Sequence, residues 1–205
     1  MGLRVMNIRN LNTASFEMNS VILGSKGKEL LGELGEAITE LTDMWKGAGA
    51  PEQINNLVNL YNTMSDGFNG VSECNVEVGK LVIDLNNAAR FNGGVPEALN
   101  EVTSVKFDKV DYLPENAHAG IEIDVPRARV VISKLQGLKG KFATISNEFE
   151  NNRRIIFNEW QDSDNHDAAE ETYSKLSEYM GTVSETLDSV VASIETAILN
   201  YQNIG

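Results

Sequence analysis

The chain has 205 residues, enough for one large domain or two small ones. Lys and Arg number 17 against 30 Asp and Glu, so the formal net charge is −13. This charge argues against nucleic-acid binding, because contacts to phosphates need a basic face. No stretch approaches the length of an apolar transmembrane helix, so we expect no membrane insertion.

Cysteine usage and the N-terminus bear on the compartment. Cys74 is the only cysteine, so no internal disulfide can form, and we expect a reduced, partly buried thiol. Residues 1–7 lack the apolar core of a secretory signal, which predicts synthesis in the cytoplasm without a cleavable leader. Because other export routes use no cleaved leader, final residence in the cytoplasm does not follow.

A first long helix is predicted from about Asn12 to Trp45. Its apolar stripe, with residues three and four positions apart, is Leu23, Gly27, Leu30, Leu34, Ile38, Leu41 and Trp45. Before it, residues 5–11 either begin the helix or form an extended arm, and Asn12 or Thr13 caps the helix start. Its interior glycines, Gly24, Gly27, Gly32 and Gly35, indicate either close approach of a neighbouring helix or a kink near Gly24.

A hinge follows at Trp45-Lys46-Gly47. Gly47 and Gly49 can adopt positive φ and close the helix, and Pro51 suits the first turn of the next one. That second helix is predicted to run to about Arg90. Its stripe is Ile54, Leu57, Tyr61, Met64, Phe68, Val71, Val78, Val82, Leu85 and Ala89.

Residues 92–121 are the least periodic part and are interpreted as a connector. Within it we predict one short helix at Pro96–Val102 and a turn at residues 113–116.

The second half begins at residues 121–126 and carries another helical stripe: Leu135, Leu138, Phe142, Ile145, Phe149, Asn152, Ile156 and Trp160. Asn152 stands where an apolar residue is due and could fix the register of packing. A turn at residues 161–166 is expected to end in a capping box, Asp167–Glu170. The last helix has the clearest stripe: Ala169, Tyr173, Leu176, Met180, Val183, Leu187, Val190, Ile194, Ile198 and Tyr201.

The two halves look like copies of one helical hairpin. Placing Trp45 on Trp160 also places Leu34 on Phe149 and Leu41 on Ile156, which indicates an internal repeat. We therefore expect an all-α fold in which a first hairpin (1–91) and a second hairpin (122–205), joined by a connector (92–121), pack as an elongated four-helix bundle. The length of the connector favours antiparallel packing, with the two hinges at opposite ends.

With paired helices and a Trp-x-Gly hinge, the chain resembles the WXG family of type VII secretion systems. The resemblance covers nearly the whole chain twice, excluding the connector. Trp45-Lys46-Gly47 matches the family motif in full, whereas the second hinge keeps Trp160 but has Asp162 in place of glycine. Members usually consist of one hairpin and pair as antiparallel dimers, so the resemblance implies a fused, tandem equivalent of such a dimer.

One feature of the family is missing. Exported partners often carry a Tyr-x-x-x-Asp/Glu signal after the second helix, and none of Tyr61, Tyr173, Tyr179 and Tyr201 has an acid four residues later. The protein then either depends on a partner that supplies the signal or acts inside the cell.

The sequence offers no convincing catalytic constellation, and we expect no enzyme activity and no cofactor. His118 and His166 have no nucleophile at a motif spacing. Asp162, Asp164, His166 and Asp167 resemble the start of a calcium loop, but the loop glycine is missing and Tyr173 replaces the closing Glu, so no metal is predicted. A basic stretch at residues 127–141 is either a solvated helix face or a docking patch for an acidic partner.

The candidate functional residues are therefore the hinges and the packing stripes. The hinge set is Trp45, Gly47, Trp160 and Asp162; the stripe set is Leu34, Leu41, Tyr61, Phe68, Phe149, Ile156, Leu176 and Leu187. Both tryptophans either plug the end of a hairpin or meet a partner.

Two function hypotheses follow from the resemblance. The first is a non-enzymatic protein exported by the type VII route, alone or with a partner, the partner being the secretion ATPase or a co-secreted helical or toxin protein. The alternative is a cytoplasmic chaperone or adaptor that binds a larger toxin. A monomer and a homodimer are both compatible with the pattern. An enzyme or metal protein built in a helical bundle has the least support, since none of the predicted long helices carries a Glu-x-x-His pair; Glu115 and His118 have this spacing but lie in the connector.

Overall fold

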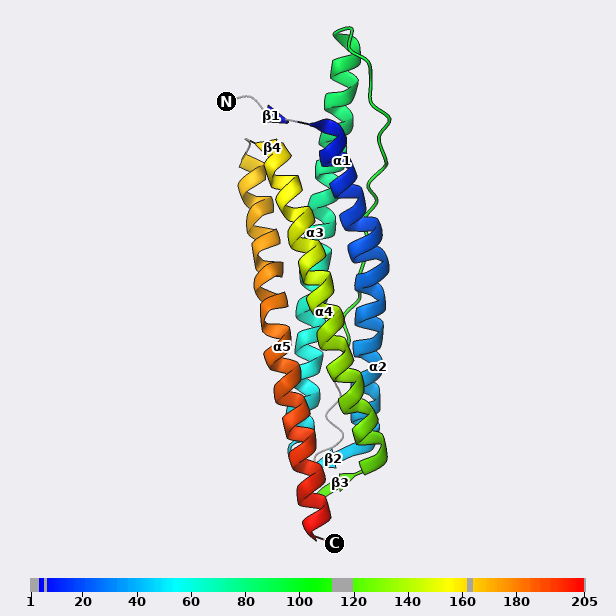
Figure 1. The fold of residues 1–205 in the computed structure, drawn as a ribbon, viewed down its shortest axis with the longest axis vertical. Helices are drawn as coiled ribbons and strands as arrows, with labels where there is room; N and C mark the ends of the chain where they lie inside the picture. Colours follow the sequence, from blue (N-terminus) through cyan, green and yellow to red (C-terminus); the bar gives the residue numbers. More distant parts are fainter. Residues whose placement is uncertain (1–3, 6, 112–119, 162–163, 205) are drawn as a thin grey trace. The chain divides into compact units, whose positions relative to one another are not determined.

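The computed structural model is all-helical apart from four very short strands (Figure 1). It describes residues 4–5, 7–111, 120–161 and 164–204. In chain order the elements are β1 (Arg4–Val5), α1 (Ile8–Glu17), η1 (Met18–Gly27), α2 (Lys28–Met44), β2 (Trp45–Gly47), α3 (Ala50–Phe91), β3 (Ile121–Ile123), α4 (Val125–Glu159), β4 (Trp160–Gln161) and α5 (Asp164–Ile204). None of the described helices combines the length and the apolar content needed to cross a bilayer.

The chain divides into two compact units that do not follow sequence order. Unit 1 comprises residues 1–28, 66–107 and 144–178, and unit 2 comprises residues 29–65, 108–143 and 179–205. Each unit therefore takes helical segments from both sequence repeats, and α3, α4 and α5 contribute to both units.

The first helical region starts earlier than the sequence predicted. Asn7, not Asn12 or Thr13, caps α1, because the backbone N–H of Asn10 donates to the Asn7 side chain at 3.0 Å. The predicted alternatives for residues 5–11 both occur, since Val5 lies in β1 and Ile8 begins α1. Asn12 is instead buried inside the helix.

The glycines of this region explain why the helix is not uniform. Residues 18–27 form a π-helix, and a Cβ on Gly24 would stand 2.6 Å from the carbonyl oxygen of Asn19. A Cβ on Gly27 would lie 3.3 Å from the ring of Phe68. The predicted close approach of a neighbouring helix is confirmed at Gly27, which faces α3, whereas around Gly24 the chain forms a π-helical turn.

The other long helices follow the sequence prediction except at one boundary. The second helix, α3, ends one residue beyond the predicted Arg90. Asp124 caps α4 by accepting from the N–H of Arg127 at 3.1 Å. α5, however, begins at Asp164, so the predicted capping box lies inside the helix and Asp167 does not start it.

The predicted short helix at Pro96–Val102 is wrong. Residues 95–111 contain no helix and follow an extended path, with Val102 and Phe107 buried. Local pattern could not reveal this, because the hydrogen bonds that hold the segment come from other helices, as described below. The predicted turn at residues 113–116 lies outside the described residues.

Candidate interaction sites

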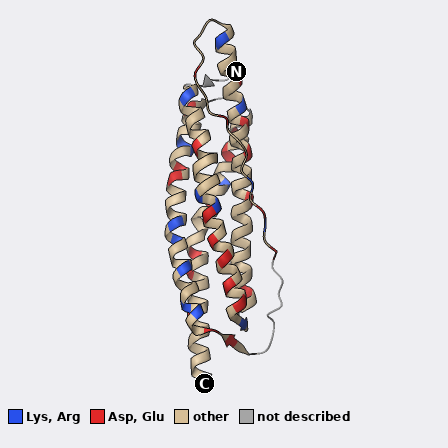
Figure 2. Ribbon diagram, turned by 90° about the vertical axis from the view of Figure 1, so that its right-hand side faces the viewer, with Lys and Arg blue, Asp and Glu red and all other residues tan. Residues whose placement is uncertain are grey.

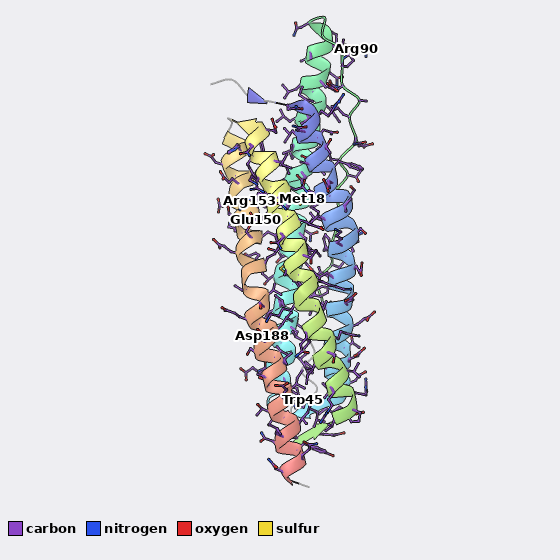
Figure 3. All side chains as sticks on the ribbon, viewed as in Figure 1. Met18, Trp45, Arg90, Glu150, Arg153 and Asp188 are labelled. Atoms are coloured by element: carbon purple, nitrogen blue, oxygen red, sulfur yellow. The ribbon has the colours of Figure 1, made fainter. Side chains whose placement is uncertain are left out.

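The first hinge is a strand rather than a simple turn. In unit 2, β2 pairs antiparallel with β3, placing Trp45 opposite Ile123 and Gly47 opposite Ile121. Gly47 and Gly49 have the predicted positive φ, 91° and 83°, but α2 ends at Met44 and Gly47 is the last residue of β2, so neither glycine closes the helix. Trp45 is only 1% exposed, so its indole belongs to the core of unit 2 (Figure 3).

The second hinge has the same construction in unit 1. There β4 pairs antiparallel with β1, and Trp160 stands opposite Val5. The indole of Trp160 is 4% exposed and stacks on Phe157, with ring centroids 6.1 Å apart. His166 approaches both rings edge-on. Asp162, the residue in the glycine position of the motif, lies outside the described residues.

The two hinge strands are paired reciprocally. β2, the hinge of the first sequence repeat, pairs with β3, which directly precedes the first helix of the second repeat. β4, the hinge of the second repeat, pairs with β1, which precedes the first helix of the first repeat. In each unit the turn of one hairpin thus meets the open end of the other.

The predicted stripe residues are almost all buried. Those below 2% exposed are Leu34, Leu41, Phe68, Phe149, Ile156, Leu176 and Leu187, whereas Tyr61 is half-buried. Burial places them in the helix packing of their units, where they stabilise the fold and offer no exposed contact surface.

A chain of buried polar side chains crosses the core of unit 1. The hydroxyl of Tyr173 donates to Asn75 at 2.5 Å, and the amide of Asn75 donates to Asn19 at 2.9 Å. The amide of Asn19 in turn donates to the backbone oxygen of Thr103 at 2.9 Å. Burial raises the pKa of Tyr173 well above its ordinary value, so its hydroxyl keeps the donated proton.

The network ends on an extended segment, residues 97–107, which we call the strap. Three asparagines each form a pair of hydrogen bonds with one strap residue, donating to its carbonyl and accepting from its N–H. Asn86 binds Glu97 (2.9 Å and 2.9 Å), Asn12 binds Asn100 (2.8 Å and 2.8 Å) and Asn69 binds Phe107 (2.9 Å and 2.9 Å). The N–H of Val105 also donates to Ser72 at 2.7 Å.

Residues 108–110 are held in unit 2 by the same means. The Asn62 amide donates to the carbonyl of Val110 and accepts from its N–H, both at 2.9 Å, and Ser65 donates to the carbonyl of Asp108 at 3.2 Å. These side chains supply the hydrogen bonds that a neighbouring β-strand would supply.

The basic stretch of α4 is mostly exposed, which agrees with the predicted solvated helix face, while docking of an acidic partner stays a prediction. In unit 2 its lysines form ion pairs within the chain: Lys134 contacts Glu40 at 2.8 Å, and Lys141 contacts Glu29 at 3.2 Å (Figure 2 shows the charged residues). Lys139 contacts Asp188 of α5 at 2.6 Å. The hydrogen bond with Glu40 is the main cause that raises the pKa of Lys134. The three lysines therefore pair with acidic side chains of α2 and α5.

Unit 1 contains similar polar contacts. Lys26 contacts Glu148 at 2.5 Å. Arg153 and Glu150, one turn apart on α4, form an ion pair at 3.3 Å (Figure 3), and the Arg153 guanidinium donates to Ser174 of α5 at 2.8 Å. Lys26 and Glu148 link the two sequence repeats, whereas the contacts of Arg153 lie within the second repeat.

Three comparisons with known proteins found no match to this chain. No family profile, no curated protein and no solved structure matches it. The candidate sites are therefore judged on their own geometry.

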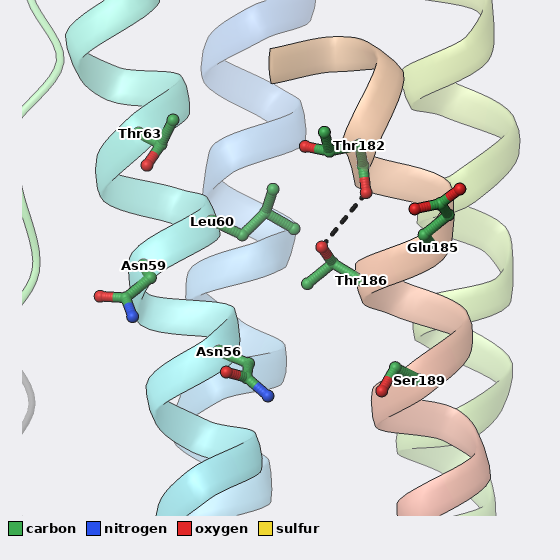
Figure 4. Close-up of a pocket in the computed structure, with 8 residues that line it drawn as sticks. All are labelled: Asn56, Asn59, Leu60, Thr63, Thr182, Glu185, Thr186 and Ser189. Carbon is green, nitrogen blue, oxygen red and sulfur yellow. Dashed lines mark hydrogen bonds between the residues drawn. The ribbon is translucent and has the colours of Figure 1, made fainter. Parts of the chain in front are cut away.

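A polar hollow lies between α3 and α5 in unit 2 (Figure 4). Its volume is about 450 Å³, and Asn56, Thr63, Glu185 and Ser189 are among the residues that line it. Thr186 donates to the backbone of Thr182 at its edge. The lining brings no nucleophile together with a base, and we assign it no chemistry.

The titratable residues of the second hinge do not form a persuasive metal site. His166, Asp167 and Glu170 place their ligand atoms within 4.8 Å of one another, but both carboxylates are exposed. His166 is instead hydrogen-bonded to Asp167 at 3.2 Å. Solvation and the positive end of the helix account for acids in the first turns of α5. His118 lies outside the described residues.

Cys74 is half-buried on α3, and burial raises the pKa of its thiol. The partial burial that the sequence predicted is thus confirmed.

The polar residues of the network and the strap were missed from the sequence, although a signal existed. Asn75 stands between Val71 and Val78, at a position of the α3 stripe where an apolar residue is due. Asn62, Ser65, Asn69 and Ser72 are three and four residues apart and so share one helix face.

Proposed function

We propose that the chain is a non-enzymatic, fused equivalent of a WXG dimer that acts in a type VII secretion system. In this proposal its two hairpins, residues 1–91 and 122–205, replace the two subunits and pack antiparallel as an elongated four-helix bundle. The connector then joins what are separate chains in the usual dimer.

The reciprocal pairing of the hinge strands is the observation that carries this proposal. An antiparallel pair of hairpins brings each turn to the open end of the other hairpin, whereas a parallel pair would bring the two turns together. β2 with β3 and β4 with β1 each join a turn to an open end. A tryptophan in both hinges and positive φ at Gly47 agree with the family motif.

The antiparallel arrangement predicts a long distance between the hinges. Spin labels would be attached at Ala48 and Asn165, both exposed, in a Cys74→Ser background that removes the native thiol. Since the 42 residues of α3 span about 60 Å at 1.5 Å per residue, we expect an electron–electron distance of about 50 Å or more. A narrow distribution below about 25 Å would contradict the arrangement.

Export is tested separately from architecture. We expect the protein in culture fluid of the native host, and its loss from that fluid when the secretion ATPase is deleted, with a cytoplasmic enzyme as the lysis control. Retention in the cells whether or not the ATPase is present would count against export.

Such retention would favour the alternative, a cytoplasmic chaperone or adaptor for a larger toxin. The specific observation behind this alternative is the strap, because a surface that binds an extended segment by its backbone suits a protein that holds a client. Recovery of a co-purifying toxin from cells, with none in culture fluid, is the result that this alternative predicts.

A further inference from the structure

We propose that the groove of unit 1 beneath the strap is a general binding site for an extended peptide, and that the strap is its exchangeable occupant. The partner is an extended segment of another protein with two apolar side chains five residues apart. This inference concerns recognition of a main chain and does not depend on the type VII assignment.

The groove binds its occupant mainly through hydrogen bonds to the main chain. Asn12, Asn69 and Asn86 each bind both the N–H and the C=O of one strap residue, at 2.8–2.9 Å. A planar amide that pairs with both groups is indifferent to the side chain of the residue it binds. Main-chain hydrogen bonds of this kind give affinity without sequence preference.

The spacing of the amides suits an extended chain. Asn12 and Asn19 are seven residues apart along α1 and η1, a rise of roughly 10 Å. They bind Asn100 and Thr103, three residues apart. Three residues of extended chain also cover roughly 10 Å. The side-chain amides of Asn12 and Asn19 are therefore spaced like residues three apart in an extended chain.

The two most deeply buried apolar side chains of the strap, Val102 and Phe107, supply most of the side-chain specificity. Phe107 packs on Phe68, with ring centroids 5.1 Å apart, and lies beside Gly27. Val102 lies over Gly79, where an added Cβ would stand 2.9 Å from the Val102 Cβ. Both side chains are less than 9% exposed.

Between these anchors the half-buried Val105 also faces the helical region, where a Cβ on Gly24 would stand 3.5 Å from its Cγ2, but the other side chains do not contribute to the contact surface. Thr103, Ser104 and Lys106 are exposed, as is Glu101 just before the first anchor. A tether between two hairpins requires none of these backbone pairs, whereas a peptide site requires both the pairs and the two anchor positions.

The test asks whether the strap sequence binds without its covalent link. The full chain would carry Val102→Ser and Phe107→Ser, which remove both anchors of its own strap, and a protease site inserted between Gly93 and Gly94 to free one end. Cutting lowers the effective concentration of the internal competitor. The probe is a fluorescently labelled peptide of residues 95–110, and binding is followed by anisotropy.

We expect saturable binding of this peptide to the opened chain and at least tenfold weaker binding to the uncut wild type. A second peptide, in which every residue except the anchors Val102 and Phe107 and the half-buried Val105 is replaced by Ser or Thr, should bind within about threefold of the first. A third peptide, with only those two anchors replaced by Ser, should lose at least tenfold. Adding Asn69→Ala to the opened chain should weaken binding about tenfold, since one lost backbone pair of about 1.4 kcal/mol equals a factor of ten.

The matched control is Asn87→Ala, which changes an exposed asparagine of the same helix and should leave the affinity unchanged. Circular dichroism confirms that each variant keeps its helices. Absence of binding by the first peptide to a folded, opened chain overturns the proposal, and so does failure of the second peptide.

Hydrogen exchange on the wild-type chain gives an independent measure if the opened variant does not fold. The amides of Asn100, Val105 and Phe107 should exchange through local opening, at least a hundredfold faster than the core amides of α3. If the strap amides exchange only when the whole chain unfolds, the strap does not leave the groove in the native state, and the proposal is overturned.

Discussion

Replacing Trp45 by alanine is expected to lower the free energy of unfolding by about 3–5 kcal/mol, the usual range when a fully buried aromatic side chain is removed. Trp45 is 1% exposed and lies where β2 pairs with β3. Because the paired strands hold the backbone around it, neighbouring side chains cannot readily fill the cavity left by the indole. Trp160→Ala should cost a similar amount, because Trp160 is 4% exposed at the equivalent hinge. Urea denaturation followed by circular dichroism measures both.

A phenylalanine replacement separates volume from hydrogen bonding. The indole nitrogens of Trp45 and Trp160 are buried, and neither has a hydrogen-bond partner among the described residues. Trp→Phe therefore removes an unpaired donor together with part of the ring. We expect it to cost less than half of the alanine value at either hinge.

Phe91→Ala is the control for these measurements, because Phe91 is 92% exposed and its loss should change stability by less than about 0.5 kcal/mol. If Trp45→Ala also costs less than about 1 kcal/mol, the hinge tryptophan does not hold the end of the hairpin. Its presence in the motif would then need another explanation, such as contact with a partner.

The helices and hinges could be predicted from the sequence because their signals are local. Apolar residues three and four apart, a Trp-x-Gly hinge and Pro51 each act on neighbouring residues, and α3 accordingly ends within one residue of the prediction. The start of α1 was missed because Asn7, Asn12 and Thr13 are all acceptable caps, and only the three-dimensional path selects one.

The strap could not be predicted for the opposite reason. Its conformation is imposed by asparagines that lie up to 88 residues away, as in the pair formed by Asn12 and Asn100. Residues 96–102 have acceptable helix composition, and tertiary hydrogen bonds override that preference. The strand pairs at the hinges were missed similarly, since strands of two or three residues carry no periodic signal.

The ion pairs of α4 illustrate a third case. The sequence shows the basic residues, but not the acids that face them. Lys134 and Glu40 come from different helices and meet only in the folded unit. The sequence gives the net charge, whereas the fold decides which charged side chains pair with one another.

Replacing Asn75 by leucine is expected to lower the free energy of unfolding by about 2–4 kcal/mol. The change leaves two buried groups without their partner, the Tyr173 hydroxyl and the Asn19 side-chain oxygen. Each unpaired buried polar group costs about 1–3 kcal/mol, and the added apolar surface of leucine offsets part of this. Tyr173→Phe alone should cost about 1–2 kcal/mol, since it leaves only the Asn75 oxygen without its donor.

The double variant Asn75→Leu/Tyr173→Phe decides whether these residues act as a network. Removing both partners of a buried hydrogen bond is cheaper than removing either one, so the double variant should cost at least about 1 kcal/mol less than the sum of the single changes. Tyr201→Phe on the same helix is the control, because Tyr201 is 45% exposed and its change should be near neutral. Strict additivity would contradict a coupled network. Coupling would instead mean that the core of unit 1 selects its packing register through Asn75, and that the strap, bound to Asn19 at the far end, is coupled to the packing of α5.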